Sequence, residues 1–247
     1  SVLPLLLVLP LCWSPVLVYY VCPISFCAEQ GTVGRWEKIG ERDGIAAYIR
    51  ANSRAPVNES RSTCIINAPV AEVERAARDI SIYKRFMFMS KKVKPIDHPD
   101  FKNNQDTQGI YLLQAFPWPV ADRDGVGRID FYVQKNTNTI LIFIKLLKSD
   151  YPPIPKGTTR MPFCEDVWIL KPINATTTEL SYQVLMDPGG NLTMIPGPVT
   201  DYVAKYFGTY TCRNFRKIVE EGKYKNTSGI ITQTPLPDNF KIYLNRE

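Results

Sequence analysis

The chain has 247 residues, a formal net charge of +6 and a hydrophobic content of 45%. A chain of this length buries a sizeable core and forms one large domain or two small ones, of which we expect one. Its lysines and arginines are scattered with no run of five, which argues against a nucleic-acid-binding surface. The mild positive charge is at least as compatible with attraction to an anionic membrane surface as with nucleic-acid binding.

The N-terminal residues 2–21 are almost free of charge, and prolines interrupt their apolar run. Such prolines suit a cleaved leader better than a spanning helix, which needs about 20 unbroken apolar residues. Small residues precede Glu29 and offer a cleavage region. We therefore expect residues 1–28 to be a signal peptide, or alternatively an uncleaved N-terminal anchor. In both cases the domain is exported, either to the periplasm or extracellular space or held on a membrane.

Cysteine and histidine are scarce in the remaining chain. Beyond the leader the cysteines are Cys64, Cys164 and Cys212, so at most one disulfide forms, and we interpret all three as small buried apolar residues. The single histidine, His98, stands in a predicted turn, and we interpret it as a solvated loop residue. A zinc site needs about four ligands. We therefore predict neither a metal site nor a cofactor.

The first predicted elements precede a run of strands. Residues 36–50 alternate as two short strands around a turn at 42–44, and a third strand follows at 61–67. Residues 68–80 predict a helix with proline in its first turn and glutamates near its positive end. A short helix or turn over 82–89 is apolar on all sides, which implies burial from several directions.

From residue 91 onward the pattern is almost entirely strand, and turn signals separate the segments. The predicted strands are 93–96, 109–116, 126–134, 140–147, 167–170 and 180–186. Because no helix intervenes, we expect an antiparallel sheet. A long amphipathic helix is predicted over 199–221, and the tail 223–247 is expected to be loosely ordered. A curved sheet crossed by one helix encloses space, because the twist draws the strands away from the helix.

Several motifs occur in a fixed order between Trp36 and Glu220. They are Trp36 with Gly44-Ile45 and Tyr48, Ala68-Pro69 with Val73, Pro117 and Pro119 before Arg123-Asp124, Arg160 twelve residues before Pro172, Asp187-Pro188-Gly189-Gly190 with Ile195-Pro196, and the long last helix. Each motif is weak alone, but the ordered set is specific. In this order they resemble the START domains, the steroidogenic-acute-regulatory-related lipid-transfer family. A leader directly before such a domain resembles the secreted bacterial members.

The resemblance implies an α+β helix-grip fold, in which a curved antiparallel sheet wraps around a long C-terminal helix and encloses a hydrophobic tunnel. The START-like domain would span residues 29–222 and hold one lipid in a pocket of roughly 300 to 1,000 Å³. The implied function is noncatalytic binding and transfer of that lipid, with transient contact to a membrane surface. We expect a monomer that binds no nucleic acid.

Two polar positions that distinguish the family's ligands are altered here. Phosphatidylcholine-binding members carry an arginine and an aspartate after a tyrosine in the helix before the sheet. The corresponding stretch starts at Tyr83, where Lys84 can meet a phosphate but Phe88 replaces the carboxylate that faces choline. Sterol-type members place an inward arginine where this chain has Ile129. The resemblance therefore leaves the identity of the lipid open.

Alternation along the strand 125–133 places Ile129 and Phe131 on the inward face. Ordinary core packing is the alternative reading of such residues, and Arg123 with Asp124 alternatively forms a structural ion pair. The candidate ligand-binding residues are Lys84, Phe88, Arg123, Ile129, Phe131, Trp168, Val203, Tyr206 and Tyr210. We expect the ligand to enter past loops at 121–122 and 193–194, which move with the last helix.

An enzyme of the wider helix-grip group, a cyclase or hydrolase acting on a hydrophobic substrate, is the alternative function. General acid-base catalysis needs a titratable group in the cavity with a shifted pKa. Only Asp166, Glu165 and the tyrosines are candidates, and no pair among them is convincing, so we predict no catalytic residue and no enzyme. An inward carboxylate that touches no arginine or lysine would favour the enzyme. A structural or regulatory partner-binding role is a third possibility.

Overall fold

The computed structural model describes residues 33–116, 118, 120–190 and 197–244. The chain divides into two units, residues 1–30 and 31–247, of which the first lies outside the described part. The leader expected at 1–28 and the loop at 193–194 therefore fall outside the described residues. No helix that the structure describes is both long and apolar enough to cross a membrane.

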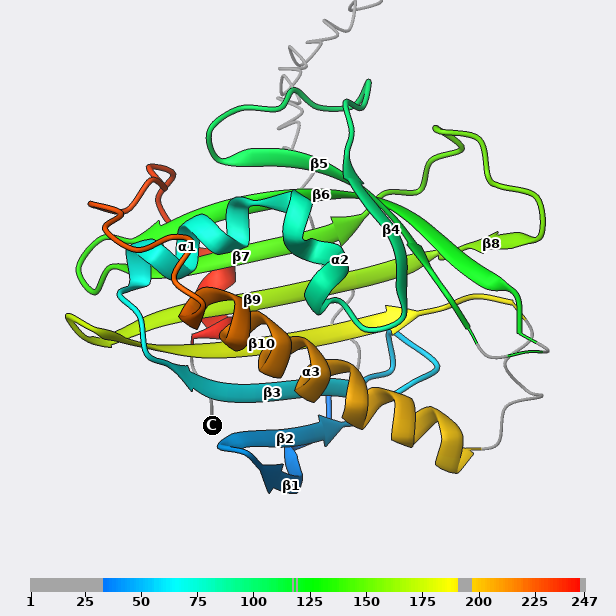
Figure 1. The fold of residues 1–247 in the computed structure, drawn as a ribbon. Coiled ribbons are helices and arrows are strands. Elements are labelled where there is room, and N and C mark those ends of the chain that lie inside the picture. Colours follow the sequence, from blue (N-terminus) through cyan, green and yellow to red (C-terminus); the bar gives the residue numbers. More distant parts are fainter. Residues whose placement is uncertain (1–32, 117, 119, 191–196, 245–247) are drawn as a thin grey trace, which may run out of the picture. The chain divides into compact units, whose positions relative to one another are not determined.

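Ten strands form one sheet, in which nine follow the order β1-β2-β3-β10-β9-β7-β6-β5-β4 (Figure 1). The strands are β1 (Glu37–Arg42), β2 (Ile45–Arg50), β3 (Glu59–Ile66), β4 (Ser90–Pro95), β5 (Thr107–Gln114), β6 (Asp122–Gln134), β7 (Thr139–Leu146), β8 (Thr158–Arg160), β9 (Phe163–Asn174) and β10 (Thr177–Asp187). Neighbours in this order pair antiparallel, whereas β8 pairs in parallel with β6. The predicted antiparallel sheet is confirmed.

Helices cover one face of this sheet (Figure 1). Helix α1 (Val70–Arg78), the 3-10 turn η1 (Ile80–Ile82) and α2 (Tyr83–Phe86) carry the chain from β3 to β4 at the other side of the sheet. The long helix α3 (Gly197–Glu220) contacts β2, β3 and β10, and also α1 and α2. This arrangement is the helix-grip fold that the sequence predicted.

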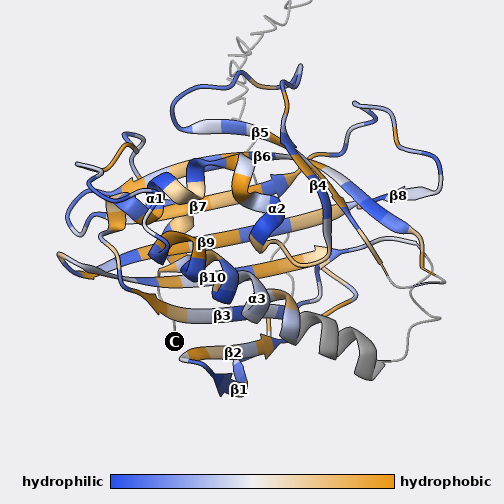
Figure 2. Cartoon of the chain, viewed as in Figure 1, coloured by the Kyte–Doolittle hydropathy of each residue, from blue (hydrophilic) through white to orange (hydrophobic). Residues whose placement is uncertain are grey.

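The main core lies between the helices and the sheet. Ile129 and Phe131 of β6 are fully buried there, together with Phe86 of α2 and Phe215 of α3. Each large apolar side chain buried in this way stabilises the fold by about 1.5 to 3 kcal/mol. Figure 2 shows hydrophobic residues concentrated along the central strands, whereas the outer sides of the helices and the loops are largely hydrophilic. The predicted inward face of β6 is confirmed.

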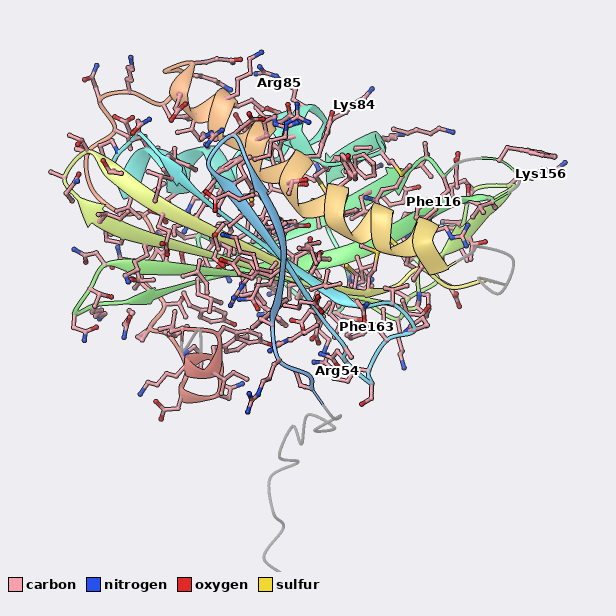
Figure 3. The ribbon with its side chains drawn as sticks, turned by 90° about the horizontal axis from the view of Figure 1, so that it is seen from below. Arg54, Lys84, Arg85, Phe116, Lys156 and Phe163 are labelled. Atoms are coloured by element: carbon pink, nitrogen blue, oxygen red, sulfur yellow. The ribbon has the colours of Figure 1, made fainter. Side chains whose placement is uncertain are left out.

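The opposite face of the sheet is covered by the C-terminal segment, which ends in the 3-10 helix η3 (Asp238–Tyr243) (Figure 3). The packed side chains are Leu141, Val167 and Ile169 of the sheet and Leu236, Phe240, Tyr243 and Leu244 of the segment. The expectation that residues 223–247 are loosely ordered is therefore wrong for 223–244. An apolar sheet face needs a cover, and a tail with apolar residues at intervals supplies it.

Two acidic side chains fix the start of this C-terminal segment. The buried Glu74 carboxylate accepts hydrogen bonds from the backbone N of Thr232 at 2.8 Å and from its hydroxyl at 2.6 Å. Asp106 does the same for Thr234, at 2.9 and 2.8 Å. Arg78 lies between them and pairs with each carboxylate at 3.0 Å. The network joins α1, the residue that precedes β5 and the C-terminal segment.

The three cysteines beyond the expected leader and the single histidine are buried or partly buried. Cys64 and Cys212 are buried and Cys164 is partly buried, and all three are free thiols. His98 is buried, which corrects its interpretation as a solvated loop residue. Its Nε2 lies 3.0 Å from the Ser149 hydroxyl, and its ring stacks on Phe101 with centroids 5.6 Å apart. The ring therefore holds two loops together.

Candidate functional site

The inner face of β9 carries an acidic group among apolar neighbours. Alternation along the strand places Asp166 beside Trp168, and the paired strand β10 sets Tyr182 directly opposite Trp168. Asp166 is only 6% exposed. Among the described residues, its carboxylate makes no ion pair. A buried charge without a partner is costly, so this position departs from ordinary core packing.

The hydrogen bonds of Asp166 are few and weak. Its Oδ2 accepts one from the Tyr182 hydroxyl at 3.3 Å, and its Oδ1 accepts one from the Cys164 thiol at 3.3 Å. A good hydroxyl donor lies near 2.7 Å, and a thiol is a weak donor. Burial raises the pKa of Asp166 to about 7, against the smaller opposing effect of these two donors. The carboxyl therefore exchanges a proton near neutral pH and has spare capacity to accept hydrogen bonds.

Three further polar atoms on this inner face are buried without a hydrogen-bond partner among the described residues: Ser60 Oγ of β3, Trp168 Nε1 and Thr211 Oγ1 of α3. Thr211 lies one helical turn from Phe207 and one from Phe215. The ring centroid of Phe207 lies 6.5 Å from that of Tyr182, and the ring centroid of Phe215 lies 5.0 Å from that of Trp168. Thr211 therefore faces the strip of sheet that carries Trp168 and Tyr182. Buried polar groups normally have partners, so unpaired ones mark a place for a polar ligand atom or water.

Partly buried apolar side chains lie on the same side of the sheet as the acidic group. Met87 and Phe88 after α2, Cys164 of β9 and Met186 of β10 pack against the core but are only partly buried. The Phe88 ring meets Phe207 at 6.0 Å and Tyr210 at 5.3 Å, which closes the gap between α2 and α3 on that side. Partly exposed apolar groups on an inner face offer a surface to a hydrocarbon chain. We name Asp166, Trp168, Tyr182 and Thr211 the polar strip.

A buried arginine joins the two loops beside this site. The Arg123 guanidinium donates to the carbonyl of Pro188 at 2.9 Å, to that of Gly189 at 2.8 Å and also to that of Ala121. Its cation lies 4.9 Å above the centroid of Phe116. Burial lowers the pKa of Arg123. The side chain thus ties the β5–β6 loop to the segment that follows β10.

The glycines after β10 allow this close approach. Gly189 and Gly190 have φ angles of 65° and 74°, which favour glycine. A Cβ on Gly189 would lie 2.8 Å from Pro162, and a Cβ on Gly190 would lie 3.0 Å from the Arg123 guanidinium. Asp187 steadies the turn, because its carboxylate accepts a hydrogen bond from the Gly189 backbone N at 2.8 Å. The motif that resembled a family signature therefore has a geometric role.

Arg123 and Asp124 do not pair with each other, which corrects the reading of them as a structural ion pair. Asp124 instead binds Arg160 of β8 in a bidentate pair, with distances of 3.0 and 2.7 Å. The same guanidinium donates to the carbonyls of Ser149 and Pro152. Its hydrogen bond to Asp124 raises the pKa of Arg160. The pair fixes β8 and the loop before it against β6.

The predicted ligand-binding residues occupy three environments. Ile129, Phe131 and Trp168 are buried in the core, and Trp168 packs against Phe86, Tyr182 and Phe215 with centroids 5.0 to 5.6 Å apart. Phe131 lies 4.0 Å below the Arg78 cation, beside the network that holds the C-terminal segment. Only Trp168 of these three belongs to the polar strip.

The remaining predicted residues lie on or near the helices. Phe88 and Tyr210 contact each other, and Tyr206 and Tyr210 are 40% and 38% exposed. Lys84 is exposed on α2, on the helix side of the sheet (Figure 3). The side chain of Val203 falls outside the described part of the chain. The structure thus brings Phe88 and Tyr210 together and leaves Lys84 at the surface.

Sequence reasoning missed the role of Cys164, Tyr182, Phe207 and Thr211, and it placed Asp166 outside the predicted strand. The alternation Cys164, Asp166, Trp168 extends the inward face of β9 by two positions and was the available signal. A charged residue within an otherwise apolar inward series is unusual enough to mark a site. Thr211 carried no comparable signal, because a threonine in an amphipathic helix is common.

The chain is similar in sequence to one curated protein and in structure to lipid-transfer domains. No family model matches it. An uncharacterized protein of Pseudomonas aeruginosa is 28% identical over 159 residues, which cover 64% of this chain and 74% of that protein.

Among solved structures, a fragment of a STAR-related lipid transfer protein from Xanthomonas axonopodis is 25% identical. It superposes with a TM-score of 0.64 and covers 75% of this chain and 98% of that chain. The human StAR-related lipid transfer protein 5 is 17% identical, with a TM-score of 0.64 and coverage of 75% and 86%. Human STARD10 is 13% identical, with a TM-score of 0.63 and coverage of 76% and 74%. The two human proteins show a shared fold alone.

Proposed function

We propose that this protein binds a single lipid between its sheet and α3, and carries it between membranes without catalysis. The observation that carries the proposal is the polar strip: a buried carboxyl without an ion pair, and the Trp168 and Thr211 donors without a hydrogen-bond partner, on the side of the sheet that also carries partly buried apolar side chains. A hydrophobic ligand with one polar end matches that distribution, because the apolar groups take the chain and the polar groups take the end. The bacterial lipid-transfer relative with the same fold supports the proposal.

The loops that Arg123 joins are the proposed gate. Lipid passage requires a segment near the site to move, and loops yield more easily than sheet strands. The Arg123 hydrogen bonds to Pro188 and Gly189 would close the site when they form and open it when they break. The exposed Trp118 in the neighbouring loop would contact the membrane surface during exchange. We propose that the protein does this as an exported monomer, and that it binds no nucleic acid.

The direct test is native mass spectrometry of the protein purified from its own host under mild conditions. We expect one bound lipid per chain, which solvent extraction releases for identification. A Trp168→Ala variant and a matched Trp36→Ala variant, which removes a tryptophan outside the polar strip, separate loss of the site from loss of any tryptophan. A protein that carries no lipid and takes up none from vesicles would contradict the proposal.

A second candidate function rests on Asp166 itself. An inward carboxylate that pairs with no arginine or lysine is the feature that favours an enzyme of the helix-grip group, and a pKa of about 7 suits general acid-base catalysis. The described inner face offers Asp166 only Tyr182 and Cys164 as a second acid or base at hydrogen-bonding distance, and burial raises the pKa of each well above its usual value. The identified lipid decides between the two functions: an enzyme converts it, and a carrier releases it unchanged.

A further inference from the structure

The inward charges of the described domain are unequally satisfied. The buried and partly buried arginines have fixed partners: Arg78 pairs with Glu74 and Asp106, Arg160 pairs with Asp124, and Arg123 donates to three carbonyls. The buried Arg61 lies over the rings of Trp36 and Tyr48. Asp166 has only two weak donors, the Cys164 thiol and the Tyr182 hydroxyl, each at 3.3 Å. A ligand entering this region therefore finds an acceptor that lacks a strong donor, and finds no unengaged cation among the buried arginines.

From this imbalance we infer that the polar end of the bound lipid is a hydrogen-bond donor, a hydroxyl or a protonated amine, and that it points at Asp166. An anionic end, such as a carboxylate or phosphate, is rejected at this position. The inference rests on the proposed function, since it names the class of lipid that the same site accepts. It assigns Asp166 as the residue that sets specificity.

The electrostatics of a buried site determine how strongly Asp166 discriminates between donor and anionic ends of a lipid. A protonated amine beside an ionised carboxylate forms a charge-assisted hydrogen bond, and a hydroxyl forms a single hydrogen bond to the same oxygen. An anionic end would place two like charges within a few ångströms, and burial weakens the screening that water would supply. The unpaired Trp168 Nε1 and Thr211 Oγ1 remain available to a second polar atom of the ligand.

The test uses three amphiphiles with one chain and different ends: 1-hexadecanol, hexadecylamine and hexadecanoic acid. Each displaces a fluorescent fatty probe from the full-length protein at pH 8, where the amine is charged and the acid is ionised. We expect the alcohol and the amine to bind at least about tenfold more tightly than the acid, a difference of about 1.4 kcal/mol in binding free energy. Equal binding of all three would overturn the inference and leave lipid binding intact.

The variant Asp166→Asn isolates the carboxylate. The neutral amide keeps the volume but removes the charge, so we expect amine binding to weaken about tenfold and acid binding to strengthen. Asp238→Asn, on the exposed surface of η3, is the matched control and should change none of the affinities. An Asp166→Asn protein with the same order of preference as the unmodified chain would overturn the assignment. Binding of none of the three, together with an empty purified protein, would overturn both the inference and the proposed function.

The pH dependence separates the two kinds of donor. The amine stabilises the ionised carboxyl, so its affinity should increase as the pH rises from 6 to 8, while the alcohol should change much less. A steeper dependence for the amine supports a pairing with Asp166. An identical dependence for the acid and the amine would contradict it.

Discussion

The buried carboxyl of Asp166 lowers the free energy of unfolding of the ligand-free protein once it ionises. Its folded pKa of about 7 lies above the value of about 3.9 that an exposed aspartate has in an unfolded chain. The folded protein therefore holds a proton that the unfolded chain releases between these pH values. The stability that protonated Asp166 contributes is fully present below about pH 4 and is lost as the pH rises through about 7.

Replacing this group tests that cost. We expect Asp166→Asn to have a higher free energy of unfolding than the unmodified chain at pH 8, by up to about 4 kcal/mol. The folded and unfolded pKa values of Asp166 differ by about three units, each of which corresponds to 1.36 kcal/mol, and the uncharged asparagine does not incur this loss. At pH 4 the two proteins should be similar. Urea denaturation of the ligand-free proteins at pH 4, 6 and 8 measures this. Asp238→Asn is the control, and a difference between the proteins that stays constant with pH would contradict the assigned pKa.

Arg123 supports a second prediction at this scale. Arg123→Gln removes the hydrogen bonds that join the β5–β6 loop to Pro188 and Gly189, and leaves the buried Pro188 carbonyl unpaired, at a cost of about 1 to 3 kcal/mol. We expect faster lipid exchange between labelled and unlabelled vesicles and a lower unfolding temperature. Arg128→Gln, a partly exposed arginine of the same strand, is the control. Unchanged exchange by a folded Arg123→Gln protein would argue against this gate.

At the level of the elements, most strands and the long helices were predictable from the sequence, whereas the C-terminal segment that covers the other face of the sheet was not. Alternation located β5, β6 and β7 within a few residues, because one face of each strand meets the core. β9 was predicted too short, since Glu165 and Asp166 interrupt its apolar series. The three residues of β8 carry no periodic signal. The C-terminal segment was misjudged because it is held by backbone N–H groups on distant carboxylates and by a few widely spaced apolar side chains, which leave no periodic pattern.

The attachment of that segment can be tested through Glu74. We expect Glu74→Ala to lower the free energy of unfolding by about 3 to 5 kcal/mol, because it leaves the buried Arg78 without one of its carboxylates. It should also release the amide of Thr232, which Glu74 binds. Hydrogen exchange of the segment 231–234 measures the release directly. Arg75→Ala, an exposed residue of the same helix, should leave both quantities nearly unchanged.

For the whole molecule, the START resemblance and the solved relatives agree on the helix-grip fold, while the lipid and the cellular location stay predictions. The fold was predictable because ordered motifs spread over the domain constrain its topology. The ligand was not, because it depends on a few inward side chains whose neighbours come from β9, β10 and α3.

The export of the protein is testable at the same scale. Protein isolated from the native host should begin near Glu29, because a proline-interrupted apolar leader followed by small residues suits a signal peptidase. N-terminal sequencing of the secreted or periplasmic fraction measures this. Recovery of the chain with residues 1–28 intact in a membrane fraction would support the anchored alternative instead.

The pairing of β3 with β10 has a consequence for how the domain folds. Thr178 of β10 donates to the carbonyl of Ala68, 110 residues away, and Thr232 reaches Glu74 across 158 residues. Closing such loops costs entropy before any contact is gained, and chains with many distant contacts fold slowly, in milliseconds to seconds. The edge of β3 that pairs with β10 stays open until residues 177–187 have been made. A nascent chain is therefore vulnerable to aggregation at that edge. A chaperone that covers the edge would be needed most before β10 has been synthesised.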